Sequence, residues 1–334
     1  MANKYENQIT RSRAERDKAL IIEISDIFDI IRDKSRSAAT KVTDKANGDD
    51  NYFTPVGRQE KFAKELNEEL RPDYLKKDNF SKQVYAEEYR TAYFESLYTI
   101  TNEGISEGYL VKLPRYTKKQ FEQAIRYPLS KLMNNIKMKT ARSIDIEQVY
   151  TTIVSGVEQG LSLPKINKSI DVALGYRDSQ TGKWIADKAL RKGQTYRTTR
   201  TLRTEVLRMR STAETDQWLN QQPIVESKLQ LIETLDDRTR SQSAQMDGQI
   251  ANKEGKFKFP GISEPKYAHR SGKAAFDIND RSTTITLDPE FPPESRIQRD
   301  VKTGKNEVVP YQDFKAYAES QNLRVNRYGE VLFK

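Results

Sequence analysis

The chain has 334 residues and a formal net charge of +9, with no cysteine and one histidine. Without cysteine, disulfides, thiolate catalysis and cysteine-ligated metal sites are excluded. A histidine-rich metal site is excluded too, and so is a serine–histidine triad that does not use His269. The positive balance favours an acidic partner: nucleic acid, an anionic membrane surface or an acidic protein.

The first predicted helix covers residues 14–32. Its apolar side chains recur at helical spacing, at Leu20, Ile21, Ile24, Ile27, Phe28 and Ile31. Acidic residues and Arg32 occupy the other side of the helix. The pattern indicates a core helix, with a docking surface for another protein as the alternative. A polar loop is predicted over 44–51.

A second helical zone is predicted from about 58 to 101, with an interruption near Pro72. Tyr85, Tyr89, Tyr93 and Leu97 repeat every four residues within it. A tyrosine stripe can stack on nucleobases. Packing in a core or an interface is the interpretation we favour.

Further helices are predicted over 121–136, over 146–157, between Ser162 and Gly175, and over 195–219. Ser162 is the expected N-cap of the third of these helices, and Gly175 its stop. The last helix carries a stripe predicted to be buried, made of Leu202, Val206, Met209 and Ala213.

The most basic stretch of the chain overlaps that last helix. Between residues 183 and 210 the chain has nine Lys or Arg residues and only two acidic residues. We expect Glu205 to pair with Arg208, three residues later. The other cations are candidates for nonspecific contact with DNA or an acidic partner. They are Lys183, Lys188, Arg191, Lys192, Arg197, Arg200, Arg203 and Arg210.

Beyond residue 223 the pattern changes to a small α+β unit rich in Gly, Pro, Lys and Ser. Strands are predicted over 227–235 and 283–287, and a helix over 311–320, followed by a strand or a loose extension. A basic loop carries Lys253, Lys256, Lys258, Lys266, Arg270 and Lys273. These residues could contact phosphates without reading sequence, or form an ordinary solvated loop.

Asp236, Asp237 and Asp247 are three carboxylates that could hold Mg²⁺ for phosphoryl or nuclease chemistry. Turn-forming residues separate them, and aspartates at turns usually cap the backbone. Arg238 and Arg240 could lock such a turn through bidentate contacts. We therefore interpret this segment as a structural turn. The sequence shows neither a glycine-rich phosphate loop nor a Gly-x-Ser-x-Gly elbow.

Two blocks occur in a specific order. The first is Arg203-Thr204-Glu205-Val206, and the second is Thr234-Leu235-Asp236-Asp237-Arg238-Thr239-Arg240 with Met246-Asp247-Gly248-Gln249. The segment Asp288-Pro289-Glu290-Phe291-Pro292-Pro293 closes the series. This order resembles the C-terminal domain of the phage head-morphogenesis family, the Mu F-like minor head proteins, over residues 145 to 296.

The chain departs from that family at two places. Many members have a histidine or cysteine in the turn block, where this chain has Ser243 or its neighbours. Many also have an Asn-Cys-Arg-Cys-like run after the prolines, whereas this chain has Ser295-Arg296-Ile297-Gln298-Arg299. The expected domain therefore holds no metal, and packing and the Asp–Arg turn must maintain its conformation.

The resemblance implies a virion structural protein without enzymatic activity, cofactor or small-molecule substrate. It implies a place inside the head at the portal vertex after assembly in the host cytoplasm, with ejection alongside the DNA in some members. The implied partners are the portal protein, the major capsid or scaffold protein and phage DNA, with no membrane. One alternative is an ADP-ribosyltransferase-like or other toxin-like enzyme, on a faint echo in Ser282-Thr283-Thr284, Glu290 and Glu294. A standalone nonspecific DNA-binding protein is the other.

We predict a mainly α fold, with an elongated N-terminal helical region and a smaller α+β C-terminal domain. The predicted divisions are helical residues 1–140, a helical domain over 141–222 with the Arg-Thr-Glu helix, a turn-rich α+β domain over 223–300, and a C-terminal extension over 301–334.

Overall fold

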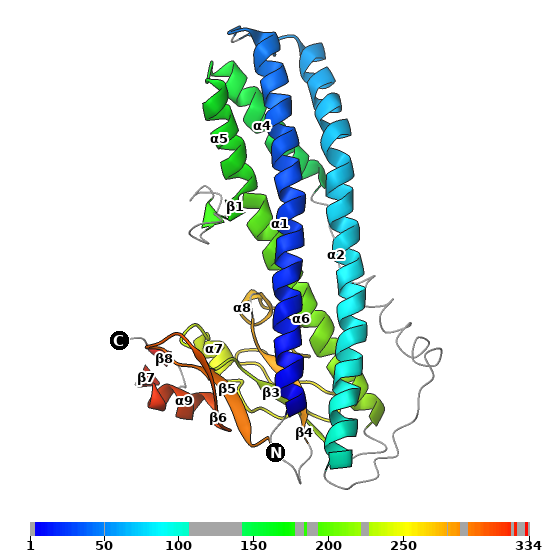
Figure 1. The fold of residues 1–334 in the computed structure, drawn as a ribbon, viewed down its shortest axis with the longest axis vertical. Coiled ribbons are helices and arrows are strands. Elements are labelled where there is room, and N and C mark those ends of the chain that lie inside the picture. The colour runs from blue at the N-terminus through cyan, green and yellow to red at the C-terminus, as the bar shows by residue number, and fades with distance from the viewer. Residues whose placement is uncertain are drawn as a thin grey trace. The chain divides into compact units, whose positions relative to one another are not determined.

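The computed structural model describes residues 4–49, 51–106, 142–177, 184–185, 193–221, 227–278, 280–287, 293–321, 324–325 and 331–332. The helices are α1 (Lys4–Ala46), α2 (Val56–Ser106), α4 (Arg142–Glu158), α5 (Leu163–Leu174), α6 (Gly193–Gln221), α7 (Ser241–Ala244), α8 (Ala274–Asp277) and α9 (Phe314–Ser320) (Figure 1). The helix predicted over 121–136 lies outside the described residues.

The strands form antiparallel pairs. These are β1 (Tyr176–Arg177) with β2 (Trp184–Ile185), β3 (Lys228–Ile232) with β4 (Thr283–Leu287), β5 (Ser295–Arg299) with β6 (Asn306–Pro310), and β7 (Arg324–Val325) with β8 (Val331–Leu332). The prediction of a mainly α chain with a long N-terminal helical region and a smaller α+β C-terminal region is confirmed.

The chain forms two compact units, each built from separated segments. Unit 1 comprises the described residues within Met1–Ala14, Val84–Met133 and Arg203–Lys334. Unit 2 comprises those within Glu15–Gln83 and Asn134–Leu202. Each unit therefore combines segments that the sequence analysis assigned to different regions of the chain.

In unit 2, α1 and α2 run side by side in opposite directions (Figure 1). An ion pair of 2.6 Å between Lys34 Nζ and Asp73 Oδ2 joins the two helices. The predicted stripe of α1 is buried at Ile24, Ile27, Phe28 and Ile31. These apolar side chains make α1 a core helix, as its spacing predicted.

Helix α1 is longer than predicted, and one of its residues lies on an unexpected side. The helix continues to Ala46, because Ala38, Ala39 and Val42 extend the buried face beyond residue 32. Arg32, expected on the polar side, is buried instead. Its guanidinium donates a hydrogen bond of 3.1 Å to the carbonyl of Gly175. The guanidinium also pairs with the carboxylates of Asp29 and Asp171, so its charge is compensated where it is buried.

The predicted interruption at Pro72 is wrong, because α2 is continuous through this residue. Proline removes one backbone donor from a helix. The ring of Pro72 is exposed, while Leu70 and Tyr74 on either side of it are fully buried. Core packing at these two positions holds the helix together through the proline.

Helices α4 and α5 form a close hairpin in unit 2. Gly156 of α4 faces Ile166 of α5, and a Cβ at Gly156 would lie 2.7 Å from Ile166 Cγ1. Gly175 stops α5 with a positive φ of 69°, as predicted. Ser162 occupies the N-cap position, but its side chain makes no capping hydrogen bond. Pro164, in the first turn, contributes to the start of α5 instead.

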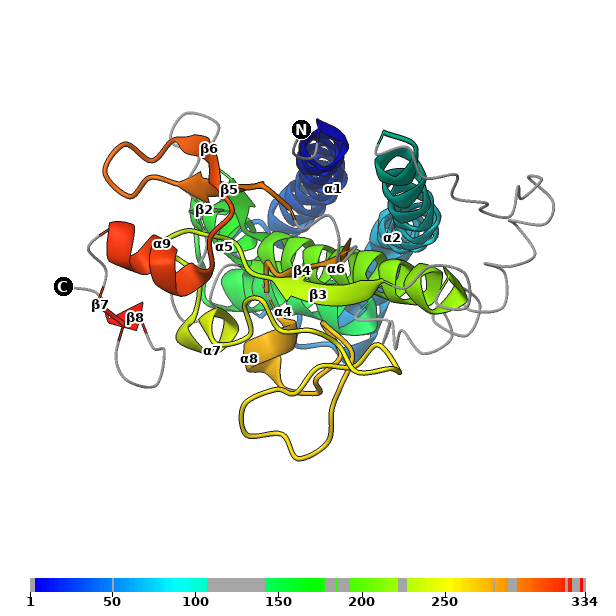
Figure 2. The ribbon, with the colours of Figure 1, turned by 90° about the horizontal axis from the view of Figure 1, so that it is seen from below.

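The main core of unit 1 lies where β3 runs alongside the C-terminal part of α6 (Figure 2). It contains Trp218, Leu229, Leu231, Met246, Phe257, Phe259, Ala268 and Phe276. A smaller cluster contains Leu235, Phe314, Tyr317 and Ala318, which joins α9 to the end of the β3 segment. The part of the chain predicted as a C-terminal extension therefore contributes to a core.

The tyrosine stripe of α2 packs inside unit 1. Tyr85, Tyr89 and Tyr93 are at most 4% exposed, which confirms the packing interpretation. Tyr89 donates a hydrogen bond of 2.7 Å to Asp216 of α6. Asn220 of α6 donates one of 3.1 Å to the hydroxyl of Tyr93. The stripe joins α2 to α6 rather than presenting its rings to a ligand.

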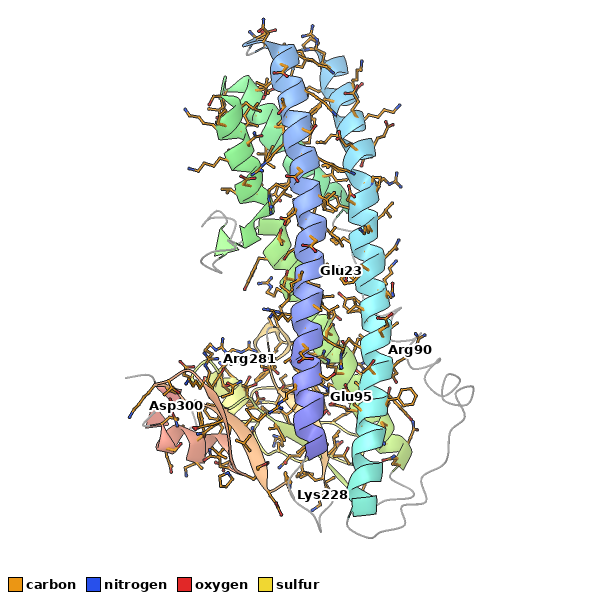
Figure 3. All side chains as sticks on the ribbon, viewed as in Figure 1. Glu23, Arg90, Glu95, Lys228, Arg281 and Asp300 are labelled. Carbon is orange, nitrogen blue, oxygen red and sulfur yellow. The ribbon has the colours of Figure 1, made fainter. Side chains whose placement is uncertain are left out.

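Unit 1 also holds the N-terminal part of α1 through a buried cation. Arg13 lies 2.7 Å from Glu95 of α2 and 2.7 Å from Glu214 of α6. Glu95 is labelled beside α1 in Figure 3. Glu214 also accepts a hydrogen bond from the Thr284 hydroxyl of β4. One polar network therefore joins four elements of this unit.

Within the described residues, no helix combines the length and the apolarity that crossing a membrane requires.

Candidate functional site

The Arg-Thr-Glu block lies on α6. The Glu205 carboxylate is nearly buried and accepts hydrogen bonds of 2.7 and 2.9 Å from the Arg208 guanidinium, which confirms the predicted pair. Burial raises the pKa of Glu205, although Arg208 opposes that shift. Arg208 also donates to the carbonyl of His269 at 3.0 Å. The block thus fastens α6 to the loop around His269, with Thr204 buried and Arg203 exposed.

The Asp-Asp-Arg-Thr turn is built around the carboxylate of Asp236, which is 1% exposed. The backbone and guanidinium of Arg238 donate hydrogen bonds to it, at 2.9 Å and 3.0 Å. Thr239 donates through its hydroxyl at 3.2 Å. Arg281, from the segment before β4, adds a two-point contact (Figure 3 labels Arg281). The predicted locking of this turn is confirmed for Arg238, and Arg281 is an additional partner. It is wrong for Arg240, which lies 3.5 Å from Asp280 instead.

These contacts set the charge state of the turn. Burial alone would raise the pKa of Asp236, but the hydrogen bonds and charge of Arg281, with those of Arg238, lower it to about 2. Asp236 is therefore an anion near neutral pH, held by two guanidinium groups. A carboxylate engaged in this way has few lone pairs left for a metal ion.

Asp247 joins three elements through one carboxylate that is 1% exposed. Oδ1 accepts from the backbone of Glu233 at 2.7 Å and from Arg296 of β5 at 2.6 Å. Oδ2 accepts from Arg296 at 2.8 Å and from the backbone of Phe314, the first residue of α9, at 2.8 Å. Asp247 is thus a structural junction and lies apart from the Asp236 contacts.

The remaining motif residues have simpler roles. Gly248 has a positive φ of 79° and donates its N–H to the carbonyl of Leu231 at 2.9 Å. A side chain at that φ would be strained. Asp237 is partly exposed, so the adjacent aspartates differ in environment. Among the described residues, no group of three acidic, histidine or cysteine side chains has a geometry that suits a metal ion.

The two arginines that complete these contacts were not predicted from the sequence. Arg281 and Arg296 come from segments 45 and 49 residues away from their aspartates. One signal for Arg281 was present in the sequence. The predicted strands pair so that Ile232 lies opposite Thr283, which brings the residues flanking them close together.

A buried polar cluster surrounds the single histidine. His269 is 2% exposed, and its Nε2 lies 3.1 Å from the carbonyl of Ser282. Its Nδ1 is 3.7 Å from Asp280 Oδ2. The Ser282 hydroxyl donates to Asp280 at 2.6 Å, and Ser243 donates to the other oxygen at 3.1 Å. The serine hydroxyl also lies 3.4 Å from His269 Nε2, and Ser282, His269 and Asp280 are all buried.

The residues of the enzyme alternative are placed as follows. The hydroxyls of Ser282 and Thr284 are buried, and both donate to carboxylates of unit 1. Glu294 is exposed before β5. Glu290 lies outside the described residues.

The predicted nucleic-acid-binding residues fall into three groups. Lys183, Lys188, Arg191 and Lys192 lie outside the described residues. Arg203 is exposed, and Arg200 is partly exposed with an interaction partner. Arg197 is exposed and lies 3.8 Å from Asp145.

The prediction for Arg210 is wrong. Its side chain is 4% exposed and forms a 2.8 Å ion pair with Glu88 of α2, itself 5% exposed. Met209, the residue before it on α6, is fully buried as well. An arginine committed to such a pair is unavailable to a phosphate group.

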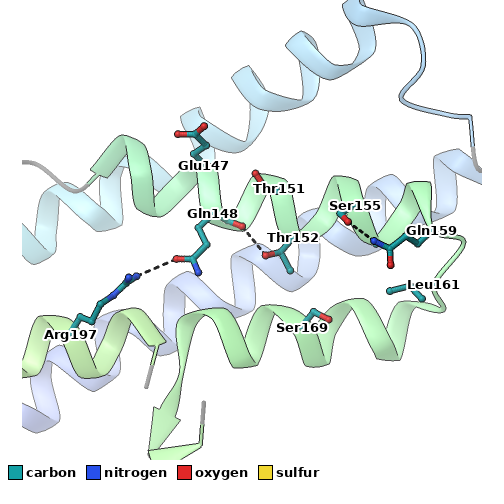
Figure 4. A pocket seen from close by; sticks show the side chains of 10 residues that line it. Glu147, Gln148, Thr151, Thr152, Ser155, Gln159, Leu161, Ser169 and Arg197 are labelled. Carbon is teal, nitrogen blue, oxygen red and sulfur yellow. Dashed lines mark hydrogen bonds between the residues drawn. The ribbon is translucent and has the colours of Figure 1, made fainter. Parts of the chain in front are cut away.

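A shallow groove of about 600 Å³ lies over α4 and α5 in unit 2 (Figure 4). Its lining is mainly hydroxyl and amide groups, and several are engaged with one another. Arg197 donates to Gln148 at 3.2 Å, and Gln159 donates to Ser155 at 2.7 Å. These four side chains therefore bind one another across the lining.

No known protein family, curated protein or solved structure matches this chain.

Proposed function

We propose that the chain is a minor capsid protein of the head-morphogenesis type, located at the portal vertex inside the head of a tailed phage. The observation that carries this proposal is the order of the Arg203-Thr204-Glu205 helix and the Asp236-Asp237-Arg238-Thr239 turn, which resembles that family. The fold agrees with the proposal at one point. Both blocks belong to unit 1, although 30 residues separate them in the sequence.

The way the motif carboxylates are used supports a structural role. Glu205, Asp236 and Asp247 each bind an arginine and lie at or below 12% side-chain exposure. Catalytic carboxylates usually face a pocket in which a substrate can reach them. Three carboxylates that form internal ion pairs are better suited to holding loops and strands in place than to binding a substrate.

In this role the chain binds the portal protein and the major capsid or scaffold protein, and it touches packaged DNA without reading its sequence. The net charge of +9 supports the DNA contact. A basic protein inside a DNA-filled shell meets a dense array of phosphates, and such contact weakens steeply as salt rises. Assembly in the host cytoplasm and exit with the DNA at ejection complete the proposal.

Mass spectrometry of purified proheads and virions tests this function. We expect the chain in both particles at a few copies each, and its absence from both would contradict the proposal. A phage that carries Asp247→Ala should lose the chain from its particles, because the substitution breaks the junction at Arg296. Asp237→Ala is the matched control, since this aspartate is partly exposed, and its particles should keep the chain.

A further inference from the structure

The basic loop, residues 252–273 between α7 and α8, is rich in positive charge and lies within the described residues. It carries six cationic residues and only two acidic ones, Glu254 and Glu264. Figure 2 shows this yellow-to-gold segment extending away from β3. Lys253, Lys258 and Lys273 are exposed. The loop belongs wholly to unit 1.

The sequence of the loop fixes which side chains face water. Lys256, Phe257, Lys258 and Phe259 alternate charge and aromatic ring. Phe257 and Phe259 are 0% and 4% exposed and belong to the main core of unit 1. Alternation along an extended segment sends neighbouring side chains to opposite faces. The two anchored rings therefore direct both lysines outward.

Hydrogen bonds make the loop a defined platform. Phe257 and Lys266 exchange backbone hydrogen bonds of 2.7 and 2.9 Å. The side chain of Asn252 accepts from the backbone of Lys256 at 2.9 Å. The side-chain amide of Gln249 accepts a hydrogen bond of 2.6 Å from the backbone N–H of Lys258 and donates one of 3.1 Å to its carbonyl. Charges on an ordered backbone lose less entropy on binding than those on a loose chain.

Several charges of the loop are available to a ligand. Within the described part of the chain, the ammonium groups of Lys253, Lys258 and Lys266 make no ion pair or hydrogen bond. Lys256, by contrast, pairs with Glu254 at 2.5 Å and lies over the Tyr267 ring.

The basic stretch predicted as the DNA-contact region is less available where it is described. Arg210 is buried against Glu88, and Arg197 lies 3.8 Å from Asp145. Arg203 is exposed. The basic loop thus offers more unengaged charge than the described turns of α6.

We propose that the basic loop is the surface of this chain that contacts the phosphodiester backbone of double-stranded DNA. The inference rests on the proposed function, since packaged DNA is the polyanion that such a protein meets. Lysines act as point charges, without the planar two-point geometry with which arginine reads guanine. The contact is therefore independent of sequence and depends on the number of lysines that reach phosphates.

The experiment compares purified full-length chains by fluorescence anisotropy with a labelled 30-base-pair duplex of mixed sequence, from 50 to 300 mM salt. The test variant is K253Q/K258Q/K266Q. The control is K302Q/K305Q/K315Q, which removes the same charge from exposed lysines elsewhere in unit 1. Each phosphate contact contributes about 0.9 to the slope of log affinity against log salt. We expect the test variant to lower that slope by about 2 to 3, and to weaken binding at 100 mM salt at least about tenfold.

The control should change the slope by less than about 1. Equal losses in both variants, or no loss in the test variant, would overturn the proposal. So would wild-type chain that binds polyglutamate but not the duplex, because the loop would then be a site for acidic protein. Unchanged thermal denaturation of the test variant shows that it is folded. The DNA-binding measurement is independent of the particle composition found by mass spectrometry. The proposal for the loop can therefore fail while the proposed capsid role stands, and the reverse.

Discussion

Replacing Asp247 with alanine should release the C-terminal elements of unit 1 from β3. The carboxylate accepts four hydrogen bonds, two of them from the backbone of Glu233 and Phe314 and two from Arg296. The alanine variant leaves the Arg296 guanidinium, 7% exposed, without its anion. Removing one partner of a buried pair costs about 3–5 kcal/mol.

The two backbone donors add to that cost. A buried donor without an acceptor costs about 1–3 kcal/mol, and the donor at Phe314 will recover part of this by binding water at the helix end. We therefore expect Asp247→Ala to destabilise unit 1 by about 4–6 kcal/mol. A loss of this size is comparable to the whole stability of many domains. Local opening of β5 and α9 is the expected consequence.

Hydrogen exchange with mass spectrometry, together with urea unfolding, measures both effects. Amides of Ser295–Arg299 and Phe314–Ser320 should exchange faster in the variant, whereas those of α6 should not change. Adding Arg296→Met should recover about 2 kcal/mol, because it removes the stranded charge. The control, Asp237→Ala, should change stability by less than about 0.5 kcal/mol. A cost below about 1 kcal/mol for Asp247→Ala, with unchanged exchange in α9, would refute this reasoning.

Three further substitutions test other contacts. Burial raises the pKa of Glu233, so the fold loses stability as pH rises through that pKa; Glu233→Gln should remove this loss, seen as a higher Tm at pH 8 than wild type. Asp236, with a pKa lowered to about 2, stabilises the fold above its unfolded pKa and loses this effect as pH falls toward 2. Arg281→Met should therefore lower the free energy of unfolding, measured in urea, by about 2 kcal/mol at pH 7 and by clearly less at pH 3. An equal loss at both pH values would contradict a stabilising ion pair between Asp236 and Arg281. Gly156→Ala should cost about 1–3 kcal/mol by its clash with Ile166 but be neutral or stabilising in an Ile166→Ala background, since alanine favours helix; a cost in both backgrounds would rule out the clash.

The periodicity of the sequence was sufficient to predict an element where one face of that element is apolar. The stripe Leu202, Val206, Met209 and Ala213 is buried along α6. The predicted strand over 283–287 has the same bounds as β4. Gly175 stops α5 because only a residue without Cβ reaches that positive φ easily.

The hairpin of β5 and β6 was missed because its alternation is inverted. In β5 the inward side chains are Arg296 and Gln298, which are 8% and 6% exposed, while Ile297 faces partly outward. A hydrophobic pattern cannot reveal a strand whose buried face is polar. In β6, Val308 is 59% exposed, so that strand has no buried stripe to read.

The length of α1 and the continuity of α2 also depended on packing that local rules do not include. Proline is a helix breaker when nothing else fixes the backbone. Tyr74 follows Pro72 by two residues and donates a hydrogen bond of 2.6 Å to Gln194. Such a contact between segments 120 residues apart cannot be read from a local window.

The absence of cysteine gives the Asp–Arg pairs their importance in the C-terminal region. The apolar cluster that joins α9 to Leu235 has only four buried members. Hydrophobic burial has no direction, and so few side chains allow several arrangements of nearly equal energy. The two-point contacts of Asp236 with Arg281 and of Asp247 with Arg296 have strict geometry. A misplaced strand would leave these charges buried and unpaired, so the pairs penalise every register but one.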